Sequence, residues 1–190
     1  MAALLIEKGA DVNASAGQAW TALTQAAYYG RMDLARLLVE KGADVNAASK
    51  TRRAPLQVAV EQGNTEIVGF LLEKGANVNA MSDDKWSPLL TATRAGANVE
   101  TIRLLLEKGA DVKARNLWNW TPLLLAAYYD DSATVRLLLE KGSDPNAALD
   151  DGRTALSMAQ KRDLPEMVQL LSQDADPIGI AKPPAANGKR

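Results

Sequence analysis

The sequence predicts an all-α solenoid, in which antiparallel helix pairs joined by β-hairpin-like loops stack along one axis. A short helix-start motif of the Thr-Pro-Leu type occurs at Thr21, Ala54, Ser87, Thr121 and Thr154, at intervals of 33, 33, 34 and 33 residues. A second motif, of the type Lys-Gly-Ala-Asp-Val-Asn, recurs in step with the first, at Lys8, Lys41, Lys74, Lys108 and Lys141. Two motifs that keep one phase over most of a chain predict a repeat array, in which each unit contacts its neighbours.

Each unit is expected to begin with a short helix. In residues 15–47, the Thr21 hydroxyl can cap this helix, and three sister units carry proline in the first turn, where a missing N–H costs nothing. Leu23 and Ala26 belong to an apolar face of mostly small side chains, and Gly30 supplies the left-handed conformation that ends the helix. Alanine recurs at the position of Ala26 in every unit, which predicts close approach between neighbouring helices.

A second helix and a hairpin are expected to complete each unit. The pattern predicts a helix from about Met32 to Lys41, with leucines three and four residues apart facing the core. On its other side, arginine and glutamate four positions apart predict exposed ion pairs: Arg36 with Glu40, Arg103 with Glu107, and Arg136 with Glu140. The polar segment after Gly42 is expected to turn back as a hairpin. Neither helix is long enough to be stable alone, so stability is shared along the stack.

The period organises residues 1–173 as a single elongated domain. We expect a partial repeat at 1–14, full repeats at 15–47, 48–80, 81–114 and 115–147, and a C-terminal capping repeat at 148–173. The partial repeat contains only a second helix, so this end is expected to fray or to mark a fragment. The Pro/Gly/Ala-rich residues 174–190 are expected to form a disordered tail.

These units resemble ankyrin repeats. The matching features are the Thr-Pro-Leu-like starts, the Ala-Ala pairs, the glycine stops, the leucine-rich second helices and the Gly-Ala-Asp-Val-Asn-Ala segments, from Leu4 to about Gln173. The resemblance implies a concave surface, formed by the hairpins and first helices, that binds other proteins.

The sequence departs from the family pattern at three places. Thr24, Gln57, Leu90, Leu124 and Ser157 stand where the family has a histidine that anchors the hairpin. The hydrogen bonds of that histidine must therefore be replaced or lost. One extra residue near 96–99 is expected to bulge the turn between two helices, and Lys113 stands where the other units have asparagine.

The composition removes most familiar active sites. The chain has no cysteine and no histidine, so it lacks thiol nucleophiles, disulfides, imidazole bases and the usual zinc and transition-metal ligands. The remaining candidates are the pairs Asp83 and Asp84, Asp130 and Asp131, and Asp150 and Asp151, which are typical of turns and helix caps. We predict no enzyme activity, no catalytic residue, no cofactor, no metal site and no small-molecule substrate.

Charge and hydropathy indicate a soluble protein. The net charge of −1 gives no overall field toward nucleic acid or an anionic membrane. The apolar run at the N-terminus is too short for a signal peptide, and no run is long enough to span a membrane. We expect a cytoplasmic monomer that does not associate with membranes.

The aromatic residues fall at two positions of the repeat. Of four tryptophans, four tyrosines and one phenylalanine, all except Phe70 lie in the hairpins or at the ends of first helices. In ankyrin repeats these positions point into the concave groove, although aromatic residues there can also serve packing alone. Tyrosine and tryptophan are frequent interface anchors, because they bury large areas with few rotatable bonds. The predicted partner-binding residues are Trp20, Tyr28, Tyr29, Arg53, Trp86, Arg94, Leu117, Trp118, Trp120, Tyr128, Tyr129 and Arg153.

The leading hypothesis is therefore a non-catalytic interaction module, acting as a scaffold, adaptor or inhibitor, that docks a protein or peptide in its groove. Trp118, Trp120 and Tyr128 are its expected hot spots, each costing about 2 kcal/mol or more when cut to alanine. An engineered or selected binder would use the same mechanism. Nucleic-acid binding is the alternative of a different class, since Arg52, Arg53, Arg94 and Arg115 accompany tryptophans that could stack on bases. Acidic residues in the same loops weigh against it.

Overall fold

Five helix pairs make up most of the part of the chain that the structure describes. The computed structural model describes residues 4, 7–15, 20–48 and 53–174. The first helices of the pairs are α2 (Ala22–Tyr28), α4 (Pro55–Glu61), α6 (Pro88–Ala95), α8 (Pro122–Tyr128) and α10 (Ala155–Lys161). The second helices are α3 (Met32–Glu40), α5 (Thr65–Glu73), α7 (Val99–Glu107), α9 (Ser132–Glu140) and α11 (Pro165–Asp174).

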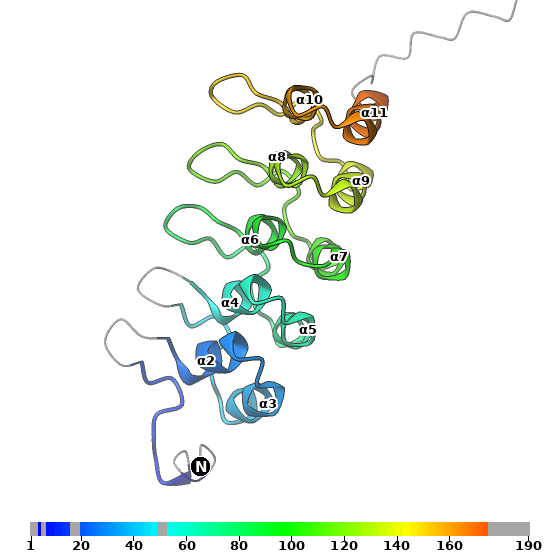
Figure 1. Ribbon diagram of the computed structural model, residues 1–190. Helices are drawn as coiled ribbons and strands as arrows, with labels where there is room; N and C mark the ends of the chain where they lie inside the picture. Colours follow the sequence, from blue (N-terminus) through cyan, green and yellow to red (C-terminus); the bar gives the residue numbers. More distant parts are fainter. Residues whose placement is uncertain (1–3, 5–6, 16–19, 49–52, 175–190) are drawn as a thin grey trace, which may run out of the picture.

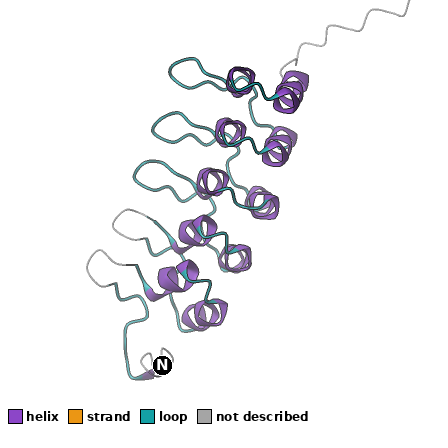
Figure 2. Ribbon diagram, in the orientation of Figure 1, coloured by secondary structure: helices purple, strands orange, loops and turns teal. Residues whose placement is uncertain are grey.

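The pairs stack into one elongated solenoid (Figure 1). First helices form one row and second helices the other, and the loops between repeats project from the first-helix row. Within the described residues these loops contain no strand, and isolated antiparallel bridges join Ser15 to Thr21 and Ala148 to Thr154 (Figure 2). The predicted all-α repeat solenoid of helix pairs and hairpin-like loops is confirmed.

The two ends of the expected domain are described only in part. The partial helix expected within residues 1–14 lies mostly outside the described residues. The expected tail does too, except that Asp174 belongs to α11, one residue beyond the expected boundary. The proposed repeat boundaries in between remain predictions.

The helix starts follow from their capping residues. The side chains of Thr21, Ser87, Thr121 and Thr154 each accept a hydrogen bond from the backbone N–H three residues later. Proline fills the first turn of α4, α6 and α8, where its missing N–H would have no helical partner. The sequence pattern thus sets the start of every first helix, and with it the point where each hairpin ends.

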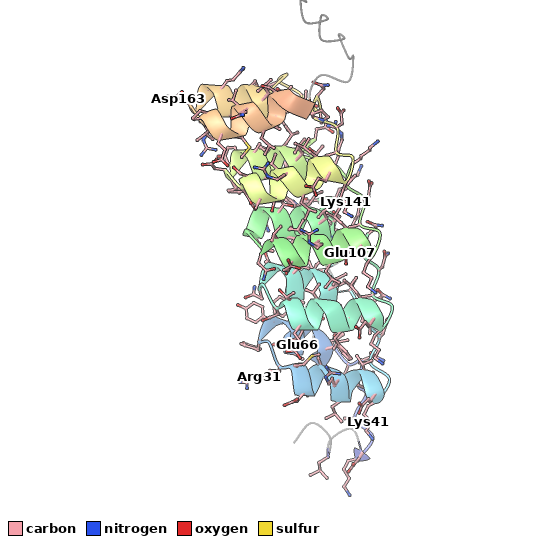
Figure 3. All side chains as sticks on the ribbon, turned by 90° about the vertical axis from the view of Figure 1, so that its right-hand side faces the viewer. Arg31, Lys41, Glu66, Glu107, Lys141 and Asp163 are labelled. Carbon is pink, nitrogen blue, oxygen red and sulfur yellow. The ribbon has the colours of Figure 1, made fainter. Side chains whose placement is uncertain are left out.

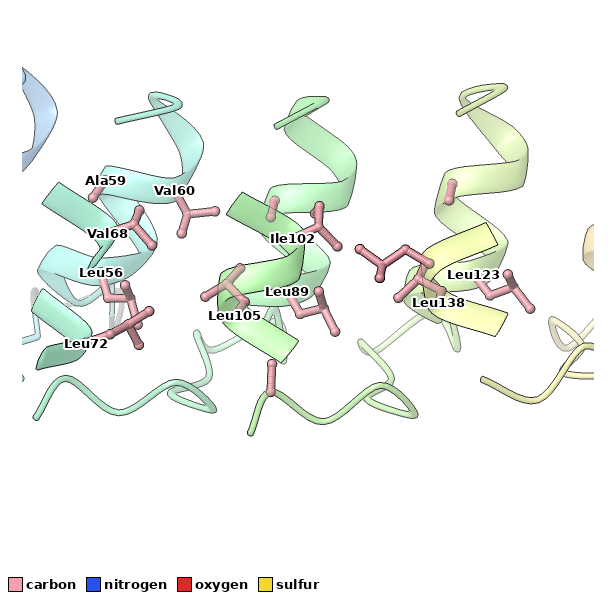
Figure 4. Close-up of a cluster of buried hydrophobic side chains, with 14 of the residues drawn as sticks. Leu56, Ala59, Val60, Val68, Leu72, Leu89, Ile102, Leu105, Leu123 and Leu138 are labelled. Carbon is pink, nitrogen blue, oxygen red and sulfur yellow. The ribbon is translucent and has the colours of Figure 1, made fainter. Parts of the chain in front are cut away.

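The core lies between the two rows of helices (Figure 4). Leu56, Leu89 and Leu123 of successive first helices are at most 1% exposed and belong to one buried cluster with leucines of the second helices, such as Leu105 and Leu138. Each such side chain contributes about 1.5 to 3 kcal/mol by leaving water. The recurring alanines 26, 59, 92, 126 and 159 are also buried, at 1% exposure or less, as close helix approach requires.

Two of the missing histidines are replaced in different ways. In the second full repeat, the Gln57 amide donates to the carbonyls of Trp86 at 2.6 Å and Ala80 at 3.3 Å, so it ties α4 to the next hairpin. In the third, Leu90 packs in a small apolar cluster with Ala114, and Trp86 covers that cluster. The hairpin is therefore anchored by hydrogen bonds in one repeat and by apolar packing in the next.

The extra residue of the third full repeat lies in the turn between its helices, as expected. Gly96 ends α6 in the left-handed conformation with φ 65°, and Asn98 is the added position before α7. The Asn98 side chain accepts from the Thr101 backbone N–H at 2.9 Å, so the inserted residue caps the following helix. Its amide also donates to the Thr65 hydroxyl of the preceding repeat at 3.3 Å.

A ladder of asparagine side chains links successive hairpins. The amide N of Asn13 donates to the Gly42 carbonyl at 3.2 Å, and its amide O accepts from the Asp44 N–H at 2.8 Å. Asn46 and Asn79 make the equivalent two bonds to the next hairpins. Lys113 holds the next position, and within the described residues its side chain makes no such bond, so the ladder stops there.

The outer face of the second helices differs from the prediction (Figure 3). Within the described residues, none of the expected Arg–Glu pairs four positions apart forms an ion pair. Arg103 lies instead 4.0 Å from Glu100, and the Arg36 guanidinium lies 5.2 Å from the centroid of the Phe70 ring in the next repeat. An aromatic ring across the repeat boundary offers Arg36 a contact that the helix pattern alone does not reveal.

Candidate functional site

In each repeat, one residue of the hairpin and one at the end of the first helix lie eight positions apart in the sequence, and in four of the five repeats the two side chains are in contact. These eight-apart pairs are Trp20 and Tyr28, Arg53 and Glu61, Trp86 and Arg94, Trp120 and Tyr128, and Arg153 and Lys161. The first member directly precedes the helix cap, and the second lies about two turns further, about 10 Å along the axis. Helical side chains tilt toward the N-terminus, so a long second side chain can reach back to a long first one.

Two of the pairs are aromatic and have similar ring distances, although the rings are inclined at 46° in Trp20–Tyr28 and at 76° in Trp120–Tyr128. The ring centroids are 5.1 Å apart in Trp20–Tyr28 and 5.3 Å apart in Trp120–Tyr128. In both repeats the next tyrosine meets this tyrosine edge-on, at 4.9 and 5.2 Å with an interplanar angle of 86°. Tyr29 is 65% exposed and Tyr129 is 51% exposed. We call these two groups the aromatic triads: Trp20, Tyr28 and Tyr29, and Trp120, Tyr128 and Tyr129.

Charged groups occupy the same places in the two repeats between the triads. Glu61 forms an ion pair with Arg53 and a second ion pair with Arg94, at 3.3 Å. The Arg94 guanidinium in turn lies 4.6 Å from the centroid of the Trp86 ring, a cation–π distance. Burial, with the nearby charge of Arg94, lowers the pKa of Arg53. This network joins two repeats through one carboxylate.

A cleft of about 380 Å³ lies over this network. Arg53, Glu61, Trp86 and Arg94 form part of its wall, and the hairpin residues Asp83 and Asp84 line it as well. The cleft therefore combines an indole with charges of both signs, a composition found in protein-binding surfaces.

The hairpin of residues 115–120 presents two exposed apolar side chains. Leu117 is 52% exposed and Trp118 is 54% exposed. The Trp118 ring lies 6.5 Å from the Trp86 ring of the preceding repeat. It therefore links the charged network around Trp86 to the repeat that holds the second triad. The two tryptophans of this hairpin thus belong to different contacts, although they are separated by one residue in sequence.

Asn116 shapes this hairpin, and sequence reasoning missed it. Its side chain is buried, and its amide O accepts from the backbone N–H groups of Trp118 at 2.9 Å and Trp120 at 3.0 Å. An asparagine that bonds to the backbone two residues later is a common turn-forming signal, so the sequence did contain the clue. Asn116 thus fixes the backbone that carries Trp118 and Trp120, and its own side chain is buried beneath the surface that a bound protein would contact.

The last eight-apart pair is basic. Arg153 bonds to Asp151, with a guanidinium-to-carboxylate distance of 2.7 Å, and leaves Lys161 exposed. The neighbouring Arg162 donates to the backbone carbonyl of Tyr128, so its cation is held beside the second triad. The hydrogen bonds from Arg153 lower the pKa of Asp151, the backbone N–H having the largest effect.

The predicted site residues divide into exposed and half-buried groups. Tyr28, Tyr29, Leu117, Trp118, Tyr128 and Tyr129 are exposed large apolar side chains. Trp20, Trp86 and Trp120 are half-buried, and Trp120 packs against both hydrophobic clusters. Cutting Trp120 to alanine would therefore damage the fold as well as the surface. Trp118 and Tyr128 are better probes of binding.

Several residues behind the other function classes are engaged within the chain. Asp131 caps α9 by accepting from the Thr134 N–H at 3.0 Å, and Asp150 accepts from the Asn119 amide. Arg115 donates to the carbonyls of Asn119 and Ala148, both at 3.2 Å. Arg52 lies outside the described residues. These carboxylates and arginines therefore have local structural partners.

Two further properties concern the described residues alone. None of their helices has the length and apolar character needed to cross a membrane. Nor does this part of the chain bring three or more carboxylates together in a group that could hold a metal ion.

Comparison with known proteins identifies the repeat type. A family model described as ankyrin repeats (3 copies) matches residues 1–82, 46–116 and 92–180, which together span most of the chain. The comparison with curated proteins found no match.

Proposed function

Because the chain belongs to the ankyrin-repeat family, we propose that it is a non-catalytic module that holds a partner protein or peptide in its concave, aromatic-rich groove. Ankyrin repeats are in general protein-interaction modules. The observation that carries the proposal for this chain is the row of exposed aromatic side chains on its hairpins and first-helix ends. In this proposal the protein serves as a scaffold, an adaptor or an inhibitor. An engineered binder would act in the same way.

The energetics of the row support binding. Tyr29, Trp118 and Tyr129 are all more than half exposed, so each has apolar surface left to bury. Residues of this kind supply most of the free energy of many interfaces, about 2 kcal/mol or more each at hot spots. A partner of ordinary size would bury about 800 Å² on this side. The half-buried Trp20, Trp86 and Trp120 contact members of this row, and side chains already held by such contacts lose less entropy on binding.

The finer parts of the proposal are a cytoplasmic location, a monomeric free state and the absence of a small-molecule substrate. Protein rather than nucleic acid is the favoured partner, because Arg53 and Arg94 share the carboxylate of Glu61 and lie in one cleft with Asp83 and Asp84. Cations already neutralised within the chain contribute little to phosphate binding.

Affinity purification with mass spectrometry tests the proposal. The bait is the full chain, compared with Trp118→Ala/Tyr129→Ala, whose two side chains are exposed. Glu66→Ala/Glu107→Ala, on the opposite, second-helix side (Figure 3), is the matched control. Equal melting temperatures show that all three baits are folded, and nuclease treatment removes proteins held through nucleic acid.

The proposal predicts one or more proteins that are captured by the native chain and by the control but lost from the aromatic variant. Capture that is equal for all three baits, or lost only from the control, contradicts the proposed face. Capture that disappears after nuclease treatment supports the nucleic-acid alternative.

A further inference from the structure

The eight-apart pairs form a single row along the solenoid, with one pair in each repeat. Their chemistry changes in a definite order from the first full repeat to the last: aromatic, ion pair, cation–π, aromatic and basic. The pairs hold equivalent places in a stack of similar units. A ligand that follows the stack therefore meets these five chemistries in turn.

The two aromatic triads are a duplicated feature within this row. Both come from the segment pattern Trp-Thr-x-Leu-x-x-Ala-Ala-Tyr-Tyr, at residues 20–29 and 120–129. Their ring distances agree to within 0.3 Å, since the pairs measure 5.1 against 5.3 Å and 4.9 against 5.2 Å. The intervening repeats have Glu61 and Arg94 where the triads have their first tyrosine. Two apolar surfaces of the same composition and similar ring spacing thus flank a polar stretch.

Charge distinguishes one end of the row from the other. In the middle, Arg53 and Arg94 share Glu61, and Asp83 and Asp84 line the same cleft, so three carboxylates face two guanidinium groups and no net positive charge remains. At the C-terminal end, Lys161 is exposed and Arg162 is held against Tyr128. Arg153 is balanced by Asp151, and Asp163 is the other exposed charge next to Arg162. An acidic group would be attracted to Lys161 and Arg162, one repeat beyond the second triad.

The distance between neighbouring repeats predicts how far apart the matching side chains lie along a bound peptide. Packed helices lie about 9 Å apart, so three repeats separate the triads by about 27 Å. An extended peptide advances about 3.3 Å per residue, which makes this distance about eight residues and one repeat about three residues. A single row of contacts, one per repeat, suits a linear ligand of this kind.

We propose that the partner presents an extended segment with two large apolar side chains about eight residues apart, and an acidic residue about three residues beyond one of them. This inference rests on the proposed function. Each apolar side chain packs on one aromatic triad, the residues between them are polar, and the acidic residue meets Lys161 and Arg162.

Selection of displayed random peptides of about 16 residues on the full chain tests the inference, since five repeats span about 13 extended residues. The expected result is enrichment of the two-anchor pattern, in either chain direction. A synthetic peptide with that pattern is then titrated against Tyr28→Ser/Tyr29→Ser and Tyr128→Ser/Tyr129→Ser. Each variant should bind about tenfold or more weakly, because each loses one anchor site.

The peptide offers matched controls. Changing one anchor to serine should remove the sensitivity to one tyrosine pair and leave the sensitivity to the other. Lys161→Glu should weaken binding of the acidic peptide and leave its amide counterpart unaffected. Glu66→Ala/Glu107→Ala should change the affinity for neither the acidic peptide nor its amide counterpart.

The possible failures are distinct. Enriched peptides with a single anchor, or binding that ignores Tyr28 and Tyr29 but needs Tyr128 and Tyr129, overturn the two-site inference and leave the proposed function standing. Selection of no binding peptide, or peptides sensitive to Glu66→Ala/Glu107→Ala, overturns the extended-peptide partner. The capture experiment on folded proteins then decides the proposed function separately.

Discussion

Replacing Lys113 by asparagine should stabilise the chain, because it would extend the asparagine ladder by one step. In the existing steps at Asn13 and Asn46, the side chain bonds to groups 29 and 31 residues later. Counted from Lys113, these offsets reach the Gly142 carbonyl and the Asp144 N–H. The receiving turn is already formed, since Asp144 accepts from the Asn146 N–H at 2.9 Å as Asp44 does from Asn46 at 2.8 Å.

The expected gain follows from the two bonds. A neutral hydrogen bond contributes about 0.5 to 1.5 kcal/mol net, and these bonds are exposed, so Lys113→Asn should add about 1 to 2 kcal/mol. For a chain of this size that corresponds to a rise in melting temperature of about 2 to 8 °C. Urea unfolding followed by circular dichroism measures the free energy of unfolding directly.

Two further variants calibrate this experiment. Asn79→Ala removes an existing step and should cost about 1 to 2 kcal/mol, since it breaks bonds to Gly109 and Asp111. Asn146→Ala should change little, because within the described residues the Asn146 side chain makes no hydrogen bond. If Lys113→Asn leaves the free energy of unfolding unchanged or lowers it, while Asn79→Ala shows the expected loss, an added asparagine step does not stabilise the chain.

Three other perturbations test separate parts of the structure. Gln57→Ala should lower the free energy of unfolding by about 3 kcal/mol, because it removes three hydrogen bonds, to the Ala54 N–H and to the carbonyls of Ala80 and Trp86, as urea unfolding would measure. Ala126→Phe should overpack a fully buried position and cost about 1 to 3 kcal/mol in the same assay. The Asp151 carboxyl should titrate below the ordinary aspartate pKa of about 3.9, and Arg153→Ala should move its midpoint only part of the way back up, because the backbone N–H of residue 153 still donates, as NMR titration would show. Because this pKa is lower in the folded chain than in the unfolded one, the contribution of Asp151 to stability is present above the unfolded pKa and is lost as the pH falls through the folded one.

The repeat period predicted the fold and the position of nearly every element. Helix starts at capped Thr or Ser residues, the turn at Asn98 and the buried alanines all follow from local rules that act within one or two units. The aromatic positions were also visible, because the period separates residues that recur for packing from those that vary. These features depend on short-range sequence and on symmetry.

The contacts that join repeats could not be read in the same way. The second ion pair of Glu61, with Arg94, and the contact of Trp118 with Trp86 depend on how neighbouring hairpins stack. Arg36 lies over Phe70 of the next repeat instead of pairing along its own helix. A helical pattern describes one helix at a time, so it does not show which side chain of the adjacent repeat competes for the same partner.

The eight-apart pairs combine structure and surface chemistry in the same residues. Trp120 supports the hairpin from a half-buried place, and its neighbour Tyr128 remains exposed for a partner. Substitution of the second member of a pair can therefore change what the surface binds at little cost to the fold. Repeats of the same fold can therefore present different side chains at the second position of the pair.

The proposed binding surface runs along the hairpins and first-helix ends. It can be tested by hydrogen–deuterium exchange of the full chain, with and without a partner obtained by capture. We expect protection of the backbone in the hairpins and at the ends of α2 and α8, with little change on the outer face of α5 and α7. Protection confined to α5 and α7, with the hairpins unchanged, would contradict it.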